Sequence, residues 1–263
     1  MFSAEWLALR EPVDHEARSL RLARFVARAV SAGNGTSVLD LACGTGSNLR
    51  YLYHHLGRPQ RWLLVDYDPA LLERAARDGR FVNELDTRCL DLNDLRDDLF
   101  EARTLVTASA LLDLVSESWV RRLATRCAAH HAAVLFALTY DGRIECDPAE
   151  PEDELVRDLT TRHQHLDQGF GPGLGPDAIA AAADALSAQG YDIHRDRSDW
   201  VIEPDRGALQ RELVNGWAEA AIQMAPASES AIRDWQRRRL AYVDERASRI
   251  VVGHEDLAAV PSA

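Results

Sequence analysis

The sequence contains no lysine: all 30 of its basic residues are arginine. This absence excludes Schiff-base chemistry and any other reaction that needs a catalytic lysine. It also excludes phosphate-binding loops of the GK[ST] type, in which a lysine reaches the phosphates. The chain has 42 acidic residues, which gives a formal net charge of −12. Because an acidic surface repels a phosphate backbone, this charge disfavours nucleic acid as a partner.

Cysteines are few, and long apolar runs are absent. The cysteines are Cys43, Cys89, Cys127 and Cys146. None forms a CxxC pair or another spacing typical of a metal site, so we expect reduced thiols, no metal ion and a cytoplasmic protein. The opening residues, MFSAEWLALREP, lack the basic start and long apolar run of a signal peptide. No run of about 18 apolar residues occurs, so no membrane-spanning helix is expected.

Between residues 36 and 140 the sequence alternates between strand-like and helix-like segments. Apolar runs predict strands at 38–41, 62–66, 104–107 and 133–138, and a weaker strand just before Asp91. Helices are predicted at 47–56, 69–77 and 118–130. Strands and helices that alternate at this pace imply parallel pairing and right-handed crossovers.

The segments on either side of this region are less regular. A helix is predicted from Asp14, as its N-cap, to about Ala32, with Gly33 and Gly35 ending it. Residues 140–143 carry a turn signal. In the C-terminal half, an acidic segment with two prolines at 147–154 and an irregular loop at 169–176 are expected. Helices are predicted at 177–189, 206–224 and 228–247. A strand or hairpin is predicted at 191–202, and a last strand at 249–252.

These boundaries predict one domain in three parts. They are an N-terminal helical segment (1–35), an α/β core (36–145) and a C-terminal part with further helices and the last strands (146–263).

The most specific motif is VLDLACGTGS, residues 38–47. A buried strand runs into a tight turn that contains Gly44 and Gly46, and a helix follows. Glycine lets the backbone approach a ligand closely and adopt a positive φ. The start of a helix offers free N–H groups and the positive end of its dipole. In open α/β sheets, ligands bind at the carboxyl ends of such strands.

This segment resembles the first motif of the class I S-adenosylmethionine (SAM)-dependent methyltransferases, whose consensus is close to V-L-D-x-G-x-G-x-G. Ala42 stands where the first glycine of that motif commonly sits. The resemblance covers roughly residues 36–140. It implies a Rossmann-like α/β fold with a mostly parallel seven-stranded sheet, helices on both faces, an N-terminal helix and a C-terminal helical insertion. It also implies SAM as the cofactor and S-adenosylhomocysteine (SAH) as the product.

The resemblance assigns roles to residues at the ends of the predicted strands. Asp66 would accept the ribose hydroxyls, and Tyr67 beside it would pack on the adenine. Asp91 and Leu92 occupy the place where the family contacts the adenine amino group. As alternatives, Asp66 caps the following helix and Asp91 is a plain turn residue.

The methionine part of SAM would lie on the glycine turn. The residues implied here are Asp40, Ala42, Cys43, Gly44, Gly46, Ser109, Ala110 and Leu111. Asp40 would organise the loop, or only orient the helix without touching the ligand. Arg10 pairs with the SAM carboxylate if the first helix folds over the cofactor, and is otherwise a surface residue.

The dinucleotide-binding fingerprint GxGxxG is the rival reading of this turn. Gly46 is followed by Ser47, Asn48 and Leu49, so the third glycine, which permits close packing of helix on strand, is missing. This favours SAM over NAD.

Methyl transfer from a sulfonium mainly needs a positioned acceptor and, for some acceptors, a group that removes a proton. The polar segment 162–170 offers His163 or His165 as a general base, with Gln164 and Phe170 shaping the pocket. The alternative for this segment is a solvated helix end and an ordinary connector.

Three further residues are candidates for the acceptor side. Asp113 follows the fourth strand, close to the expected methyl site, and is equally explained as a helix-start residue. Tyr140 ends the fifth strand and is expected to face the acceptor. Trp200 lies on a predicted strand, either in the pocket or in the core.

The residues after the fourth strand narrow the acceptor. The sequence ASAL at 108–111 lacks the N/D-P-P-Y/W tetrad that binds a planar amino nitrogen, which disfavours methylation of adenine N6 or glutamine. We predict a methyltransferase that acts on O, N or C of a small organic acceptor. The alternatives are a methyltransferase for RNA or protein and a non-catalytic SAM-binding module. Pairing of two chains through the helix at 228–247 is left open.

Overall fold

The computed structural model describes residues 3–31 and 35–262. Its helices are α1 (Ala4–Ala17), α2 (Leu20–Val30), α3 (Ser47–Leu52), α4 (Pro69–Asp78), α5 (Glu117–Ala129), α6 (Asp153–Gln164), α7 (Ala178–Ser187), α8 (Gly207–Met224) and α9 (Glu229–Asp244). Its strands are β1 (Thr36–Leu41), β2 (Gln60–Asp66), β3 (Glu84–Cys89), β4 (Leu105–Ser109), β5 (Ala133–Asp147), β6 (Tyr191–Arg197), β7 (Trp200–Ile202) and β8 (Arg249–Pro261).

The strands form one sheet in the order β3-β2-β1-β4-β5-β8-β6, with β7 also paired to β8. The first five strands of this order pair in parallel. β8 runs antiparallel to β5, β6 and β7. The predicted Rossmann-like fold with a mostly parallel sheet is confirmed. The short strand β7 is an addition to the seven that were expected.

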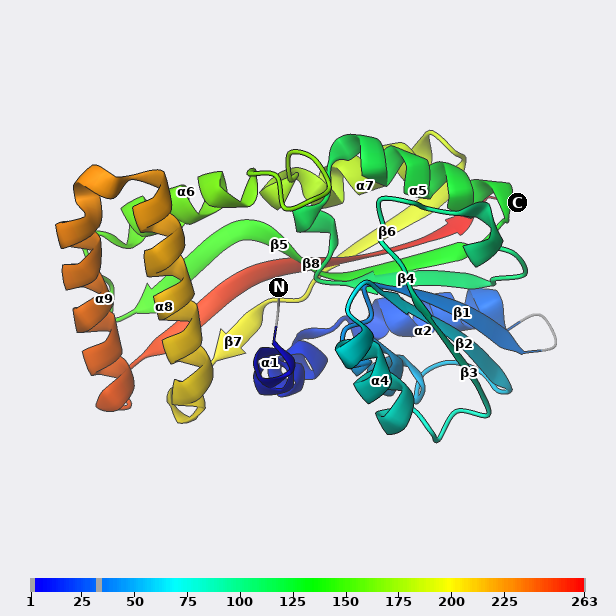
Figure 1. Ribbon diagram of the computed structural model, residues 1–263, viewed down its shortest axis with the longest axis horizontal. Helices are drawn as coiled ribbons and strands as arrows, with labels where there is room; N and C mark the ends of the chain where they lie inside the picture. Colours follow the sequence, from blue (N-terminus) through cyan, green and yellow to red (C-terminus); the bar gives the residue numbers. More distant parts are fainter. Residues whose placement is uncertain (1–2, 32–34, 263) are drawn as a thin grey trace.

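Both faces of the parallel strands are apolar, because alternate residues point to opposite sides. Leu39 and Leu63 pack with α5 and α7 on one face. Val38 and Trp62 pack with α2, α3 and α4 on the other. Figure 1 shows the sheet running between these two helical layers. The alternating sequence pattern therefore predicted the layers correctly.

The predicted turn at 140–143 is wrong, because β5 continues through it to Asp147. The register of β5 against β8 shifts at two places, between Phe136 and Thr139 and between Tyr140 and Ile144, and the second shift contains the turn-like residues. Gly142 takes a φ of 91° there. The last strand is also far longer than the predicted 249–252, since β8 runs from Arg249 to Pro261.

The single N-terminal helix expected from Asp14 to Ala32 is in fact two helices. Arg18 is the C-cap of the first helix, and Ser19 is the N-cap of the second, with its Oγ accepting a hydrogen bond from Leu22 N at 3.2 Å. Asp14 is not a cap, because it lies buried inside α1. Ala32 and Gly33 lie outside the described residues.

The C-terminal part holds one helix that the sequence did not predict, α6, which begins inside the acidic segment, after its two prolines. The helices expected at 177–189, 206–224 and 228–247 correspond to α7, α8 and α9. A hairpin at 191–202 is not formed, because β6 and β7 each pair with β8. Figure 1 shows α8 and α9 side by side over the extended ends of β5, β7 and β8.

A separate apolar cluster joins these C-terminal helices to the extended strands. Val156 from α6, Leu213 from α8 and Trp235 from α9 pack in it against Ile202 and Ile250 of the sheet. In the part of the chain that is described, no helix has both the length and the hydropathy needed to cross a bilayer.

Candidate functional site

A cavity of about 480 Å³ opens at the carboxyl ends of β1, β2 and β4, between α1 and the segment after α6. Most residues expected to bind the cofactor line it: Arg10, Asp40, Ala42, Cys43, Gly44, Asp66, Tyr67, Asp91, Leu92, Ser109, Ala110 and Leu111. Its volume falls in the range of small-molecule sites. Leu7, Asp14, Thr45, Ser47, Asn48, Leu114 and Gln168 also line it and were not predicted.

The turn after β1 needs left-handed backbone at three positions. Ala42, Gly44 and Gly46 have φ values of 52°, 54° and 83°. A Cβ on Gly44 would approach the Leu7 side chain to 3.0 Å, so α1 lies directly over the turn. Gly46 does not line the cavity. It precedes α3, and a Cβ there would come within 3.3 Å of Ala75, so its smallness serves packing.

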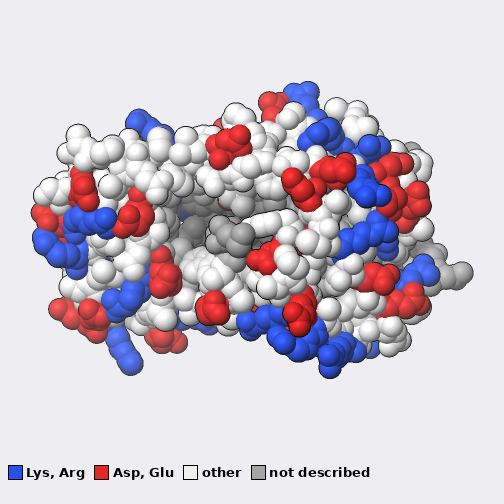
Figure 2. All heavy atoms as spheres, in the orientation of Figure 1, with Lys and Arg blue, Asp and Glu red and all other residues white. Residues whose placement is uncertain are grey.

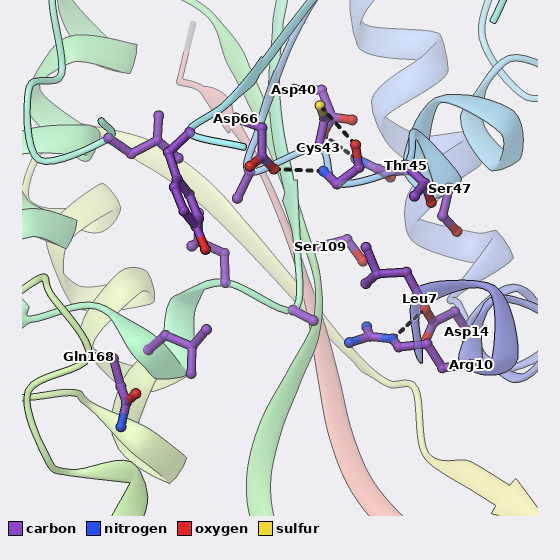
Figure 3. A pocket seen from close by; sticks show the side chains of 18 of the residues that line it. Leu7, Arg10, Asp14, Asp40, Cys43, Thr45, Ser47, Asp66, Ser109 and Gln168 are labelled. Carbon is purple, nitrogen blue, oxygen red and sulfur yellow. Dashed lines mark hydrogen bonds and ion pairs between the residues drawn. The ribbon is translucent and has the colours of Figure 1, made fainter. Parts of the chain in front are cut away.

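Asp66 holds the glycine turn in place from the end of β2. One carboxylate oxygen accepts a hydrogen bond from Gly44 N at 2.8 Å and the other from Asp68 N at 3.0 Å. Figure 3 shows the first of these bonds at the edge of the cavity. The helix cap is Asp68, which accepts from Ala70 N at 2.8 Å. Each oxygen of Asp66 keeps a second lone pair for a ligand.

Asp40 lies at the floor of the cavity, fully buried. Its Oδ1 accepts a hydrogen bond from Asn48 at 2.7 Å, and Asn48 in turn accepts one from Arg18 at 2.9 Å. Its Oδ2 has no partner among the described residues. Burial raises the pKa of Asp40 to about 7, against the lowering effects of Asn48 and Arg18. An acceptor oxygen is therefore available to a ligand that donates hydrogen bonds.

Arg10 reaches the cavity from α1, as Figure 3 shows. Its Nε donates to Asp14 at 2.8 Å, and both side chains are buried. The guanidinium carbon lies 5.2 Å from the centre of the Trp200 ring. Its two terminal nitrogens make no hydrogen bond to any part of the chain that is described. Arg10 is thus not a surface residue, and four of its N–H groups remain for an anionic ligand.

A second, smaller cavity of about 140 Å³ adjoins the first. Arg10, Ala110, Leu114 and Gln164 line both cavities, so the two meet beyond the end of β4. The other residues that line the second cavity are Trp6, Asp113, Leu138, Tyr140, Thr160, Trp200, Leu213, Trp217, Val252 and His254. The three acceptor-side candidates Asp113, Tyr140 and Trp200 are therefore together.

Many buried polar atoms around the second cavity have no hydrogen-bond partner among the described residues. They are Trp6 Nε1, Asp113 Oδ1, Tyr140 OH, Thr160 Oγ1, Gln164 Oε1 and Trp200 Nε1. Burial raises the pKa of Asp113 to about 6 and that of Tyr140 to about 12. Because buried polar groups are normally paired, such a cluster indicates a site for a polar ligand.

The two histidines proposed as general bases lie away from the second cavity. His163 lines the first cavity, with Nε2 3.1 Å from Gln223 Oε1. His165 lines neither cavity: its Nδ1 donates to Gly173 O at 2.9 Å and its ring packs against Gly175, so its role as a general base gains no support and stays a prediction. The glycine- and proline-rich loop folds back onto this ring instead of leaving it free for a substrate.

Gln164 and Phe170 are placed differently from each other. Gln164 lines both cavities, and Phe170 lines only the first, where it packs edge-on against Trp119. The sequence missed His254, Trp6 and Trp217 altogether. Each is a single residue on a helix or strand far from any motif, so no local signal marks it.

Among residues 3–31 and 35–262, no three or more His, Cys, Asp or Glu side chains are grouped so that they could hold a metal ion. All four cysteines are free thiols.

Comparison with known proteins supports a methyltransferase. Residues 38–132 match the family described as methyltransferase domain. No curated protein matches the chain.

Solved structures share the fold over nearly the whole chain. The cyclopropane synthase MmaA2 from Mycobacterium tuberculosis is 11% identical, with 98% of this chain and 94% of that chain covered and a TM-score of 0.55. Phosphoethanolamine N-methyltransferase 2 from Haemonchus contortus, solved with phosphomonomethylethanolamine and SAH, is 14% identical, with 100% and 59% covered and a TM-score of 0.50. The mycolic acid cyclopropane synthase CmaA1, solved with SAH, is 8% identical, with 93% and 85% covered and a TM-score of 0.50.

At these identities the solved structures establish the fold, and the match of residues 38–132 adds the family of the domain. Residues 38–132 therefore form a methyltransferase domain, and the chain has the Rossmann-like fold of the class I SAM-dependent methyltransferases, a family that uses SAM as its cofactor.

Proposed function

We propose that this methyltransferase acts on a small organic acceptor, which binds in the second cavity while SAM occupies the first. The observation that carries the proposal is the junction of the two cavities at Arg10, Ala110, Leu114 and Gln164. A cofactor cavity that meets a second, small cavity with unpartnered polar atoms around it suits a metabolite better than a polymer.

The first cavity offers groups that fit each part of SAM. The free lone pairs of Asp66 suit the ribose hydroxyls, and Tyr67 is available to pack on the adenine, near Asp91. The unpartnered Oδ2 of Asp40 suits the α-ammonium, and the free N–H groups of Arg10 suit the carboxylate. When bound, SAM supplies a methyl group on a positively charged sulfur that leaves as the neutral thioether of SAH.

On the acceptor side, Asp113 is the group best placed to take a proton. It comes from the short 3₁₀ helix η2 (Leu112–Leu114) that follows β4, and it lines the second cavity. With its pKa raised to about 6, it is mostly ionised at neutral pH and still a stronger base than an ordinary carboxylate. Tyr140 and Trp200 would form part of the wall of the cavity that binds the acceptor.

We further propose that the enzyme is cytoplasmic and acts on a metabolite. Its chain would form one domain, with residues 36–145 as the SAM-binding core. Figure 2 shows arginine and acidic side chains interspersed over one face, without a large basic patch. This distribution favours a small acceptor over RNA. Pairing of two chains through α9 stays a prediction.

Two measurements test the proposal on the purified chain. Titration calorimetry is expected to show binding of both SAM and SAH. An SAH-release assay against a panel of small amines, alcohols, phenols and acids is expected to identify an acceptor. Absence of SAM binding would refute the cofactor site. SAM binding with turnover on RNA or protein, and none on the panel, would refute the small-molecule assignment.

A further inference from the structure

His254, on β8, has its protonation pattern fixed by the backbone. Its Nδ1 lies 3.0 Å from Val252 O. A carbonyl oxygen only accepts hydrogen bonds, so Nδ1 carries the hydrogen and Nε2 of the neutral ring is an acceptor. The ring lines the second cavity, and Nε2 has no partner among the described residues. A nitrogen lone pair therefore remains available to a ligand in this cavity.

The surroundings of His254 keep its ring neutral. Burial and then the nearby positive charge of Arg10 lower its pKa to about 3, although Val252 O and Asp199 act in the opposite direction. Arg143, which is bound to Asp199, adds a further lowering effect. His254 thus accepts a hydrogen bond at any pH near neutrality, and does not donate from Nε2.

Asp113 offers a second acceptor in the same cavity, from η2, which follows β4. It is the one carboxylate that lines the second cavity within the described residues, and its Oδ1 is unpartnered. Trp6, Trp200 and Trp217 add aromatic surface to the walls. Aromatic faces attract cations. The guanidinium of Arg10 already lies over the Trp200 ring, so Trp6, Trp217 and the carboxylate of Asp113 are the groups that favour an ammonium in this cavity.

We propose that the second cavity selects an amine as the methyl acceptor, with Asp113 and His254 holding its nitrogen. The inference rests on the proposed function. The ammonium form donates to both Asp113 and His254 Nε2. It transfers one proton to Asp113, which leaves a neutral amine and a neutral carboxyl group. The freed nitrogen lone pair forms the new bond to carbon as the carbon–sulfur bond breaks, and its electrons stay on the sulfur of SAH.

The number of hydrogens separates an amine from other acceptors. A primary amine keeps two hydrogens after it loses a proton, whereas a hydroxyl has one and an alkene has none to donate. A hydroxyl therefore leaves either Asp113 or His254 without a partner. An unpaired buried acceptor weakens binding by roughly 5- to 150-fold.

The test uses matched ligands on the whole chain loaded with SAH. Ethanolamine is paired with ethylene glycol, and benzylamine with benzyl alcohol. Binding is read from the fluorescence of the tryptophans in the cavity walls. Each amine is expected to bind at least about tenfold more tightly than its alcohol. Equal or tighter binding of the alcohols, or binding of neither set by protein that binds SAH, would overturn the inference.

Two variants link this preference to the named residues. His254→Phe keeps a flat ring without the lone pair, and Asp113→Asn removes the charge. Both are expected to reduce the amine preference about tenfold with SAH affinity unchanged. His254→Gln, which keeps an acceptor oxygen, is expected to restore part of it, and His194→Phe on β6 is the control. An unchanged preference in both cavity variants would overturn the inference. Failure of the parent chain to bind SAH would instead refute the proposed function.

Discussion

Replacing Asp66 with asparagine is expected to weaken SAH binding strongly while the protein stays folded. The carboxylate receives hydrogen bonds from Gly44 N and Asp68 N, one on each oxygen. The side chain of asparagine has one oxygen in place of two. Either Gly44 N or Asp68 N would therefore face the amide NH₂ group, which is also a donor. A ribose hydroxyl would lose its charged acceptor as well. Loss of a hydrogen bond to a charged group costs about 1.5–3 kcal/mol. At 1.4 kcal/mol for each factor of ten, the dissociation constant rises roughly 10- to 150-fold.

The neighbouring Asp68 provides a matched control for this substitution. Its side chain caps α4 through Ala70 N, so Asp68→Ala is expected to lower the free energy of unfolding by about 1 kcal/mol. It leaves Asp66 and the glycine turn in place, and SAH affinity should not change. Calorimetry and thermal unfolding of both variants separate the two effects. Unchanged affinity in Asp66→Asn, or an equal loss in Asp68→Ala, would refute the reasoning.

Three further substitutions test other parts of the site. The pKa of Asp40 is raised from 3.8 to about 7. Between these two values the folded protein binds more protons than the unfolded chain. Its free energy of unfolding therefore falls as the pH rises from about 4 to about 7, by at most about 4 kcal/mol. Asp40→Asn is expected to abolish this fall in urea unfolding measured from pH 4 to 8, and a parallel pH dependence in parent and variant would contradict the assignment. Ala42→Gly removes a left-handed alanine and should raise the unfolding free energy by up to about 1 kcal/mol, and a lower Tm would argue against strain at this position. The kcat of the parent enzyme should rise as the pH passes about 6, because Asp113 then ionises. Asp113→Asn should lower kcat about 10²- to 10⁴-fold and make kcat independent of pH in this range. If the variant keeps the inflection near pH 6, another group is responsible for it.

The cofactor cavity was predictable because its signals are local. In a parallel sheet the carboxyl ends of neighbouring strands meet at one edge, so the residues that follow β1, β2 and β4 converge whatever the rest of the fold does. For this reason the sequence alone predicted that the turn at Gly44 and the side chain of Asp66 lie at the same edge of the sheet. The packing of Gly46 was not predictable, since only the structure shows that its missing side chain makes room for Ala75.

The second cavity was only partly predictable, because its walls come from elements that are distant in sequence. Trp6, Trp217 and His254 lie on α1, α8 and β8, and each is one residue in an otherwise ordinary helix or strand. The polar residues of β8 also hid its length. Asp256 lies beyond the predicted end of this strand at residue 252, but its buried carboxylate accepts hydrogen bonds from Ser19 N and Leu138 N. Such long-range pairing leaves no trace in local periodicity.

The place of β8 in the sheet has a consequence for how the chain matures. β6 and β7 pair with no strand other than β8 within the described residues, and β8 follows both of them in the chain. Until residues 249–261 have left the ribosome, two strands have no neighbour and β5 exposes a long apolar edge. A chain that lacks residues 249–261 is therefore expected to be a substrate for chaperones and proteases, so β8 decides whether the folded sheet survives.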